Sequence, residues 1–116
     1  MSKPFLKWAG GKYTQLNDLF QYIPSGLRLV EPFVGGGSVF LNSDKHGDFL
    51  LADVNPDLIH LYQMLTVVPD TVESSARWMF EEMGTPENYE LIRQEFNGQT
   101  LDAAERAAAF LYLNRH

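Results

Sequence analysis

Apolar and polar positions along the chain predict an α/β unit followed by helices. Two short apolar runs, residues 27–31 and 49–52, are bounded by turn-forming residues and predict strands. Residues 12–22 and 56–66 have the spacing of amphipathic helices. Beyond residue 68 apolar positions recur about every 3.6 residues, which predicts three further helices over residues 71–82, 86–96 and 101–114. No internal repeat interrupts this order.

The glycine turn after the first predicted strand is the most informative segment. It reads Glu31-Pro32-Phe33-Val34-Gly35-Gly36-Gly37-Ser38, and Val39 begins a stretch of helical character. Glycine permits close approach of a ligand and positive φ angles, and the amides at a helix N-terminus favour a ligand there. Asp53 follows the second predicted strand, where its carboxylate can accept hydrogen bonds from a ribose diol. Alternatively, the glycines form a flexible turn and Asp53 caps a helix that starts near residue 55.

The spacing of the glycines bears on which ligand the turn holds. A dinucleotide fingerprint has the form G-x-G-x-x-G, and Gly35 and Gly37 match its start, but Phe40 occupies its last position. A bulky side chain there argues against a pyrophosphate above the helix. S-adenosylmethionine contains ribose and adenine without phosphates, so it fits this turn better.

A second pair of glycines lies near the N-terminus, between Trp8 and Lys12. A phosphate-binding loop is excluded, because Leu6 and Tyr13 stand where that motif needs glycine and a hydroxyl residue. What remains is an ammonium that can pair with a carboxylate and an indole that can pack against a flat or cationic ligand. The alternative makes Trp8 a core aromatic residue and Lys12 a solvated one.

Four segments resemble the Dam-type (D12 class) N6-adenine-specific DNA methyltransferases, in order and with similar loop lengths. They are Pro4-Phe5-Leu6-Lys7-Trp8-Ala9-Gly10-Gly11-Lys12, Glu31-Pro32-Phe33-Val34-Gly35-Gly36-Gly37-Ser38-Val39-Phe40, Ala52-Asp53-Val54-Asn55-Pro56-Asp57-Leu58-Ile59 and Phe110-Leu111-Tyr112-Leu113-Asn114-Arg115. The resemblance implies an incomplete Rossmann-like fold of the S-adenosylmethionine-dependent methyltransferases, with a helix-rich second half. Residues 1–68 would be the cofactor-binding part, and residues 69–116 a helical segment that leads toward a DNA-recognition region.

The resemblance also implies an activity and roles for individual residues. Such enzymes transfer a methyl group from S-adenosylmethionine to adenine N6 in duplex DNA, commonly within GATC. Trp8 and Lys12 would lie on the methionine side of the cofactor, the turn from Phe33 through Gly35 to Gly37 beneath it, and Asp53 on the ribose. Lys7 and Arg115 match the part of the family that faces DNA, although a lysine at position 7 could equally be an ordinary solvated residue.

The family's Asp-Pro-Pro-Tyr segment, which holds the target adenine, does not occur in this sequence, where no two prolines are adjacent. We therefore expect an N-terminal fragment that contains cofactor-site residues, no catalytic residues and no methyl transfer of its own. A non-catalytic module that binds an adenosyl ligand or a protein partner, from a split or degenerate methyltransferase, stays open. A nicotinamide-binding fragment is disfavoured by Phe40.

Composition restricts the partners. The net charge is −6, and acidic residues concentrate between residues 70 and 105, whereas Lys3, Lys7 and Lys12 gather near the N-terminus. A surface for double-stranded DNA would thus be local.

The chain has no cysteine, and His46, His60 and His116 lack ligand spacing, so we expect no metal. No segment is apolar enough for a membrane span or a signal peptide, so we expect a cytoplasmic protein. The family resemblance implies that it is bacterial or phage-encoded.

Two strands are few for the parallel sheet of this fold. We expect Leu29, Val30, Leu50 and Leu51 to lack apolar partners in the isolated chain. The chain should then be marginally stable alone, or associate with copies of itself through an exposed sheet edge.

Overall fold

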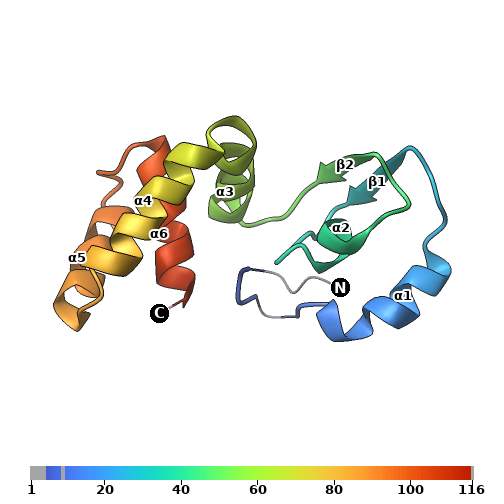
Figure 1. Ribbon diagram of the computed structural model, residues 1–116, viewed down its shortest axis with the longest axis horizontal. Helices are drawn as coiled ribbons and strands as arrows, with labels where there is room; N and C mark the ends of the chain where they lie inside the picture. Colours follow the sequence, from blue (N-terminus) through green and yellow to red (C-terminus); the bar gives the residue numbers. More distant parts are fainter. Residues whose placement is uncertain (1–4, 9, 116) are drawn as a thin grey trace. The chain divides into compact units, whose positions relative to one another are not determined.

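The computed structural model describes residues 5–8 and 10–115, and its elements are shown in Figure 1. Lys3, Pro4, Ala9 and His116, which the sequence analysis discussed, lie outside the described residues. The chain divides into two compact units, Met1–Val54 and Asn55–His116. The functional division expected at residue 68 stays a prediction, because it concerns what the two parts bind.

A two-stranded parallel sheet organises the first unit. Its elements are a 3₁₀ turn η1 (Tyr13–Gln15), α1 (Leu16–Tyr22), β1 (Arg28–Glu31), α2 (Ser38–Asn42) and β2 (Asp48–Leu51). The strands pair with Arg28 opposite Asp48 and Glu31 opposite Leu51. Nε of Arg28 lies 2.7 Å from Oδ2 of Asp48, so an ion pair links the first residues of the two strands. Both strands lie within one residue of their predicted bounds, and the unit is compatible with an incomplete α/β fold.

The first helix starts later than predicted. The sequence predicts one helix over residues 12–22, but residues 13–15 form a 3₁₀ turn and the α-helix begins at Leu16. Neither Lys12 nor Gln15 caps its following turn with a side-chain hydrogen bond. A first turn without a capping acceptor is commonly tightened to 3₁₀ geometry, which explains the difference.

Helix α2 packs on the sheet through aromatic rings. Gly37 precedes it with φ +84°, a left-handed conformation that favours glycine. The ring of Phe40 meets the ring of Phe49 from β2 edge to face, with centroids 6.0 Å apart. The position that holds glycine in dinucleotide sites therefore carries a large side chain whose ring packs against β2.

Helices α3 (Pro56–Val67), α4 (Pro69–Glu82), α5 (Pro86–Asn97) and α6 (Ala103–Arg115) form the second unit, which confirms the helix-rich second half. Side chains cap the starts of α3, α5 and α6, whereas α4 begins at Pro69 without a side-chain cap. Thr85 accepts a hydrogen bond from the amide of Asn88 at the start of α5. Asp102 and Glu105 exchange hydrogen bonds with each other's amides in a capping box, so α6 begins after Asp102 rather than at residue 101.

Helix α6 is the centre of this unit, since it contacts α3, α4 and α5. Ala107, Ala108 and Ala109 are fully buried, and such small side chains let neighbouring helices come close. Tyr112 is fully buried as well, and its hydroxyl donates a 2.6 Å hydrogen bond to the carbonyl of Met83. The hydroxyl of this buried tyrosine is thus satisfied.

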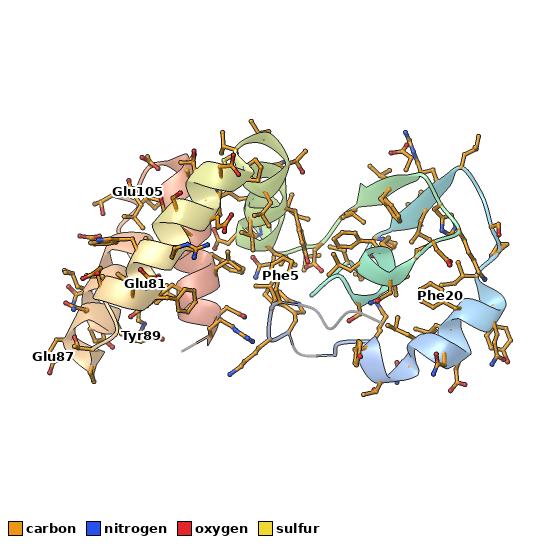
Figure 2. The ribbon with its side chains drawn as sticks, in the orientation of Figure 1. Phe5, Phe20, Glu81, Glu87, Tyr89 and Glu105 are labelled. Carbon is orange, nitrogen blue, oxygen red and sulfur yellow. The ribbon has the colours of Figure 1, made fainter. Side chains whose placement is uncertain are left out.

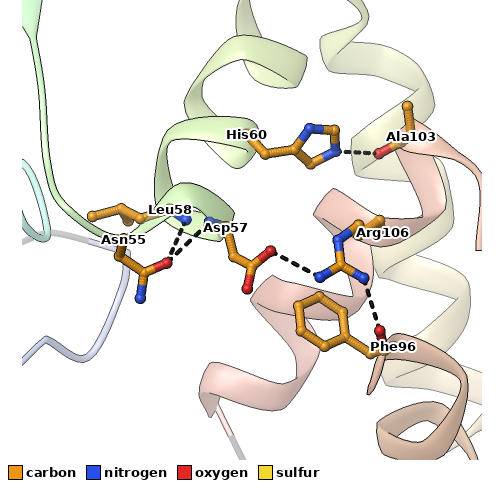
Figure 3. A network of polar contacts seen from close by, with 7 residues as sticks. All are labelled: Asn55, Asp57, Leu58, His60, Phe96, Ala103 and Arg106. Atoms are coloured by element: carbon orange, nitrogen blue, oxygen red, sulfur yellow. Dashed lines mark hydrogen bonds and ion pairs between the residues drawn. The ribbon is translucent and has the colours of Figure 1, made fainter. Parts of the chain in front are cut away.

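A polar network ties α3 to α6 (Figure 3). The guanidinium of Arg106 lies 2.8 Å from a carboxylate oxygen of Asp57 and donates a 2.7 Å hydrogen bond to the carbonyl of Phe96. It also stacks over the ring of Phe96, 4.0 Å from its centroid. Nε2 of His60 lies 2.8 Å from the carbonyl oxygen of Ala103. Together these contacts fix the start of α3 against α6.

Among the described residues, no helix combines the length and the apolar character needed to cross a membrane.

Candidate functional site

A hollow of about 260 Å³ lies in the first unit, after the carboxyl ends of β1 and β2. It is lined by all six residues predicted to bind a cofactor, which are Trp8, Lys12, Phe33, Gly35, Gly37 and Asp53. Ligand pockets typically measure about 300–1,000 Å³. The hollow lies just below this range.

Asp53 is bound to the glycine turn. Its Oδ2 accepts a hydrogen bond of 3.1 Å from the amide of Gly35, and the amide of Val34 donates to the carbonyl of Ala52 at 2.8 Å. The alternative role of Asp53 as a helix cap is wrong. Asn55 caps α3 instead, because its side-chain oxygen accepts hydrogen bonds from the amides of Asp57 and Leu58.

The indole of Trp8 explains why the turn needs glycine at position 35. Gly35 has φ +53°, and a Cβ atom placed there would lie 3.1 Å from Cδ1 of Trp8. A Cβ atom on Gly11 would lie 3.3 Å from the carbonyl oxygen of Trp8. Trp8 is half-buried and lines the hollow, so it is a wall of the site rather than a residue of the apolar core.

Lys12 is also joined to the turn. Its Nζ donates a 3.1 Å hydrogen bond to the carbonyl oxygen of Phe33, whose own side chain is 67% exposed at the hollow. An ammonium carries three donors, so this bond leaves donors for an anionic group. The structure thus places a positive charge and an exposed aromatic ring on the wall of the same hollow.

Glu31 is a residue that the sequence analysis did not single out. It ends β1, is 8% exposed, and its Oε2 is the one buried side-chain polar atom without a partner among the described residues. Burial raises the pKa of this carboxyl above its ordinary value, and the charge of Lys12 partly offsets the rise. A signal existed in the sequence, because Glu31 shares the inward side of its strand with Leu29, where an apolar residue is expected.

Neither of the two predicted DNA-facing residues lines this hollow. Lys7 is exposed in the first unit, and Arg115 is exposed in the last turn of α6 in the second unit. The helical unit carries an acidic surface, on which Glu81, Glu87 and Glu105 are labelled in Figure 2. Within the described part of the chain, no group of three or more His, Asp or Glu side chains could hold a metal ion.

Comparisons with known proteins bear on the family of this chain. A sequence model described as D12 class N6 adenine-specific DNA methyltransferase matches residues 8–116. A DNA adenine methylase of Vibrio cholerae is 49% identical over 97% of this chain and 40% of the relative. A DNA adenine methylase of Escherichia coli K12 is 48% identical over 99% of this chain and 41% of the relative.

A longer relative covers the same region. The DNA N-6-adenine-methyltransferase of Escherichia phage P1 is 46% identical over 98% of this chain and 15% of the relative. The chain thus spans about two fifths of the length of the two bacterial relatives. Because the matched segment includes the glycine turn, Asp53 and every described helix, the chain belongs to the D12 class N6 adenine-specific DNA methyltransferase family.

Proposed function

We propose that the chain supplies the S-adenosylmethionine-binding part of a methyltransferase that modifies adenine N6 in duplex DNA, within GATC. The single observation that carries the proposal is the hydrogen bond between Gly35 and Asp53, because it puts the predicted ribose acceptor directly beside the predicted cofactor turn. The cofactor would supply an electrophilic methyl group on its sulfonium, so the protein's main task is alignment.

The residues of the hollow fit an adenosyl ligand in three respects. Asp53 offers a carboxylate, which has about four lone-pair sites and can accept from a ribose diol besides the Gly35 amide. Phe33 offers an exposed ring against which adenine can pack. Lys12 offers an ammonium for the carboxylate of the amino-acid end. No described side chain in this wall is arranged as a phosphate-binding loop would require.

For DNA, we propose contacts from Lys7 and Arg115, with most of the affinity supplied by other parts of the full protein. The acidic surface of the helical unit should repel phosphates, so DNA would have to approach elsewhere. The relatives' bacterial and phage origin supports action on DNA in the cytoplasm of a bacterium or an infected cell. The Rossmann-like arrangement of the whole domain is part of the same proposal.

Isothermal titration calorimetry tests the cofactor assignment. We expect S-adenosylhomocysteine and S-adenosylmethionine to bind to the chain, and a nicotinamide dinucleotide not to bind. Tighter binding of the dinucleotide would overturn the proposal. Transfer of a labelled methyl group to duplex DNA with and without GATC, catalysed by a protein that also contains an Asp-Pro-Pro-Tyr segment, tests the activity and its recognition sequence.

A second function has one observation in its favour. The 116 residues contain no Asp-Pro-Pro-Tyr segment, so by themselves they match a non-catalytic module that binds an adenosyl ligand or a protein partner. Both proposals predict that the 116-residue chain binds S-adenosylhomocysteine without methylating DNA. They differ for the protein encoded by the complete gene, which methylates DNA only under the first proposal.

A further inference from the structure

The carbonyl groups at the end of α1 are held by a side chain from a distant part of the same unit. A helix leaves its last carbonyls without intrahelical partners. Pro24 also lacks the N–H that would normally bond to the carbonyl of Phe20, four residues earlier. Nζ of Lys45 donates to the carbonyl of Phe20 at 2.7 Å and to the carbonyl of Ile23 at 2.8 Å. The partly buried ammonium of Lys45 thus replaces the missing backbone donor.

Two further contacts hold the same region to the segment between α2 and β2. Nε2 of His46 lies 3.0 Å from the carbonyl oxygen of Pro24. The amide of Gly26 donates to the carbonyl of Lys45 at 3.3 Å. Residues 43–48 therefore form a strap across the end of α1. The strap joins α1 to α2 and β2, the elements that adjoin the glycine-turn side of the hollow.

The other end of α1 leads into the opposite wall of the hollow. Lys12 lines the hollow, and its carbonyl accepts a 3.0 Å hydrogen bond from the amide of Gln15. The amide of Leu16 donates to the carbonyl of Tyr13, so residues 12–22 form one continuous hydrogen-bonded segment.

Helix α1 has few other attachments to its unit. It is packed only lightly against the strands and α2, and Leu16 is the one buried residue of this helix, all of which the structure describes. The strap at its far end is consequently a main constraint on where Lys12 lies.

A ligand that spans the hollow touches both of its walls. Under the proposed function, the nucleoside end of the cofactor lies against Phe33 and Asp53, and the amino-acid end lies against Trp8 and Lys12. We propose that Lys45 is a positioning residue of this site, because it holds α1 so that the wall of Trp8 and Lys12 lies within reach of the amino-acid end. This proposal rests on the proposed function, since it assumes a ligand that has such an end.

The coupling between the strap and the ligand is reciprocal. If the strap favours binding of the amino-acid end, binding of that end stabilises the strap by the same free energy. A ligand without the amino-acid end contacts only the glycine-turn side of the hollow and lacks this coupling. Two ligands therefore separate positioning from a general effect on folding. They are S-adenosylhomocysteine and methylthioadenosine, which keeps the nucleoside and the sulfur but has no amino-acid group.

Calorimetry on the full chain measures the dissociation constants of both ligands. In Lys45→Met most of the aliphatic stem remains and the ammonium is lost. We expect this variant to bind S-adenosylhomocysteine about tenfold more weakly than the wild type and to bind methylthioadenosine within about twofold. Lys45→Arg, whose guanidinium can donate to two carbonyls, should recover most of the lost affinity.

Arg28→Met is the matched control. It removes a cation and an exposed ion pair from the same unit, but it removes no hydrogen bond to α1. The ratio of the two dissociation constants should therefore be the same in Arg28→Met and in the wild type.

Three results would overturn the proposal. They are unchanged affinity of Lys45→Met for S-adenosylhomocysteine, an equal loss of affinity for both ligands, and a control that changes the ratio as much as Lys45→Met does. If Lys45→Met does not fold, hydrogen exchange of the wild type decides. At equal saturation S-adenosylhomocysteine should slow exchange of the Gly26 amide more than methylthioadenosine does, and equal protection would contradict the proposal. A wild type that bound neither ligand would contradict the proposed function, and this proposal with it.

Discussion

The amide of Gly35 donates a 3.1 Å hydrogen bond to Oδ2 of Asp53, which lies 18 residues further along the chain. This bond joins the turn after β1 to the segment after β2, so one carboxylate both shapes the turn and faces the proposed ribose position. Substitution can separate these two roles of Asp53. The amide of Gly35 needs only a hydrogen-bond acceptor, whereas the hydroxyls of a ribose diol favour a charged acceptor.

We expect Asp53→Ala to weaken binding of S-adenosylhomocysteine by at least about 100-fold, since it removes hydrogen bonds to a charged acceptor and the support of the turn. Asp53→Asn keeps an acceptor for the amide of Gly35 and should weaken binding of S-adenosylhomocysteine about tenfold. Calorimetry measures both changes, with Asp44→Ala as the control. An Asp53→Ala variant with unchanged affinity would contradict the ribose assignment.

Gly35→Ala should destabilise the first unit. A left-handed backbone costs a residue with a Cβ atom about 1–2 kcal/mol, and the new methyl group would also press on Cδ1 of Trp8. Denaturant unfolding measures the loss, and ligand affinity should fall because Trp8 has to shift.

Substitutions at two other glycines separate the effect of backbone strain from the effect of the contact with Trp8. Gly10 has φ +74° with nothing near its Cβ position, so Gly10→Ala should show the backbone strain alone. Gly47 has an open Cβ position and no such φ, so Gly47→Ala should be close to neutral. If Gly35→Ala were no worse than Gly10→Ala, the contact with Trp8 would not matter to stability.

The raised pKa of Glu31 gives stability a pH dependence. Burial raises it above the ordinary value of 4.5, with Lys12 opposing, so the folded chain binds this proton more tightly than the unfolded chain. The free energy of unfolding should therefore fall as pH rises from about 4.5 through the folded pKa. Urea titrations at several pH values should show this fall in the wild type and lose it in Glu31→Gln.

Asp48 provides a contrast within the same unit. The hydrogen bond from Arg28, with its charge, holds the pKa of Asp48 below its ordinary value of 3.8. The contribution of Asp48 to the free energy of unfolding is therefore present above pH 3.8 and is lost as pH falls through the folded pKa. Asp48→Asn should therefore remove a rise of the free energy of unfolding with pH, in a lower pH range than the fall assigned to Glu31. If Asp48→Asn and Glu31→Gln changed the pH dependence of stability in the same way, the assignment to Glu31 would be contradicted.

In the helical unit, the pair Arg106 and Asp57 should couple more strongly than a surface pair. Their side chains are 22% and 34% exposed, and Arg106 also binds the Phe96 carbonyl. A double-mutant cycle with alanine should give a coupling of about 1–2 kcal/mol. The matched pair Arg77 and Glu73, more than 60% exposed, should give less than about 0.5 kcal/mol. Equal couplings would mean that the network adds nothing beyond a surface ion pair.

The exposed apolar residues of the sheet should make the chain self-associate. Val30 and Leu50 are register partners, 58% and 52% exposed, whereas Leu29 and Leu51 are half-buried. Of the four strand residues, the exposed ones therefore form one cross-strand pair. Sedimentation velocity should show concentration-dependent association, and Val30→Lys should reduce it. Leu27→Lys, at a 91% exposed position before β1, is the control. A monomer at all concentrations would contradict this prediction.

Local patterns predicted the elements well, because each boundary has a nearby physical cause. Pro56 and Asn55 mark the start of α3, and Thr85 and Pro86 mark the start of α5. One error falls where the signal is a hydrogen bond between neighbours, in the Asp102 and Glu105 capping box. Another falls before α1, where no side chain caps the first turn. Resemblance and glycine spacing also named six residues that share one hollow, although their roles stay predictions.

Sequence alone missed features that depend on three-dimensional packing. Glu31 belongs to a motif that is conspicuous in the sequence. Only the structure shows that its Oε2 is buried without a hydrogen-bond partner among the described residues. The role of Asn55 instead of Asp53 as the cap depended on which side chain reaches the amides of Asp57 and Leu58. The ion pair between Arg106 and Asp57 joins residues that are 49 positions apart in the sequence. The spacing of apolar residues does not predict such a long-range contact.

The contact between Trp8 and Gly35 also gives the protein an internal optical probe. The chain contains two tryptophans, and Trp8 lines the hollow while Trp78 lies on α4 in the other unit and is 53% exposed. A ligand that fills the hollow should change the emission of Trp8 and leave that of Trp78 as a constant background. In a Trp78→Phe variant, fluorescence would then report occupancy of the site from a single indole.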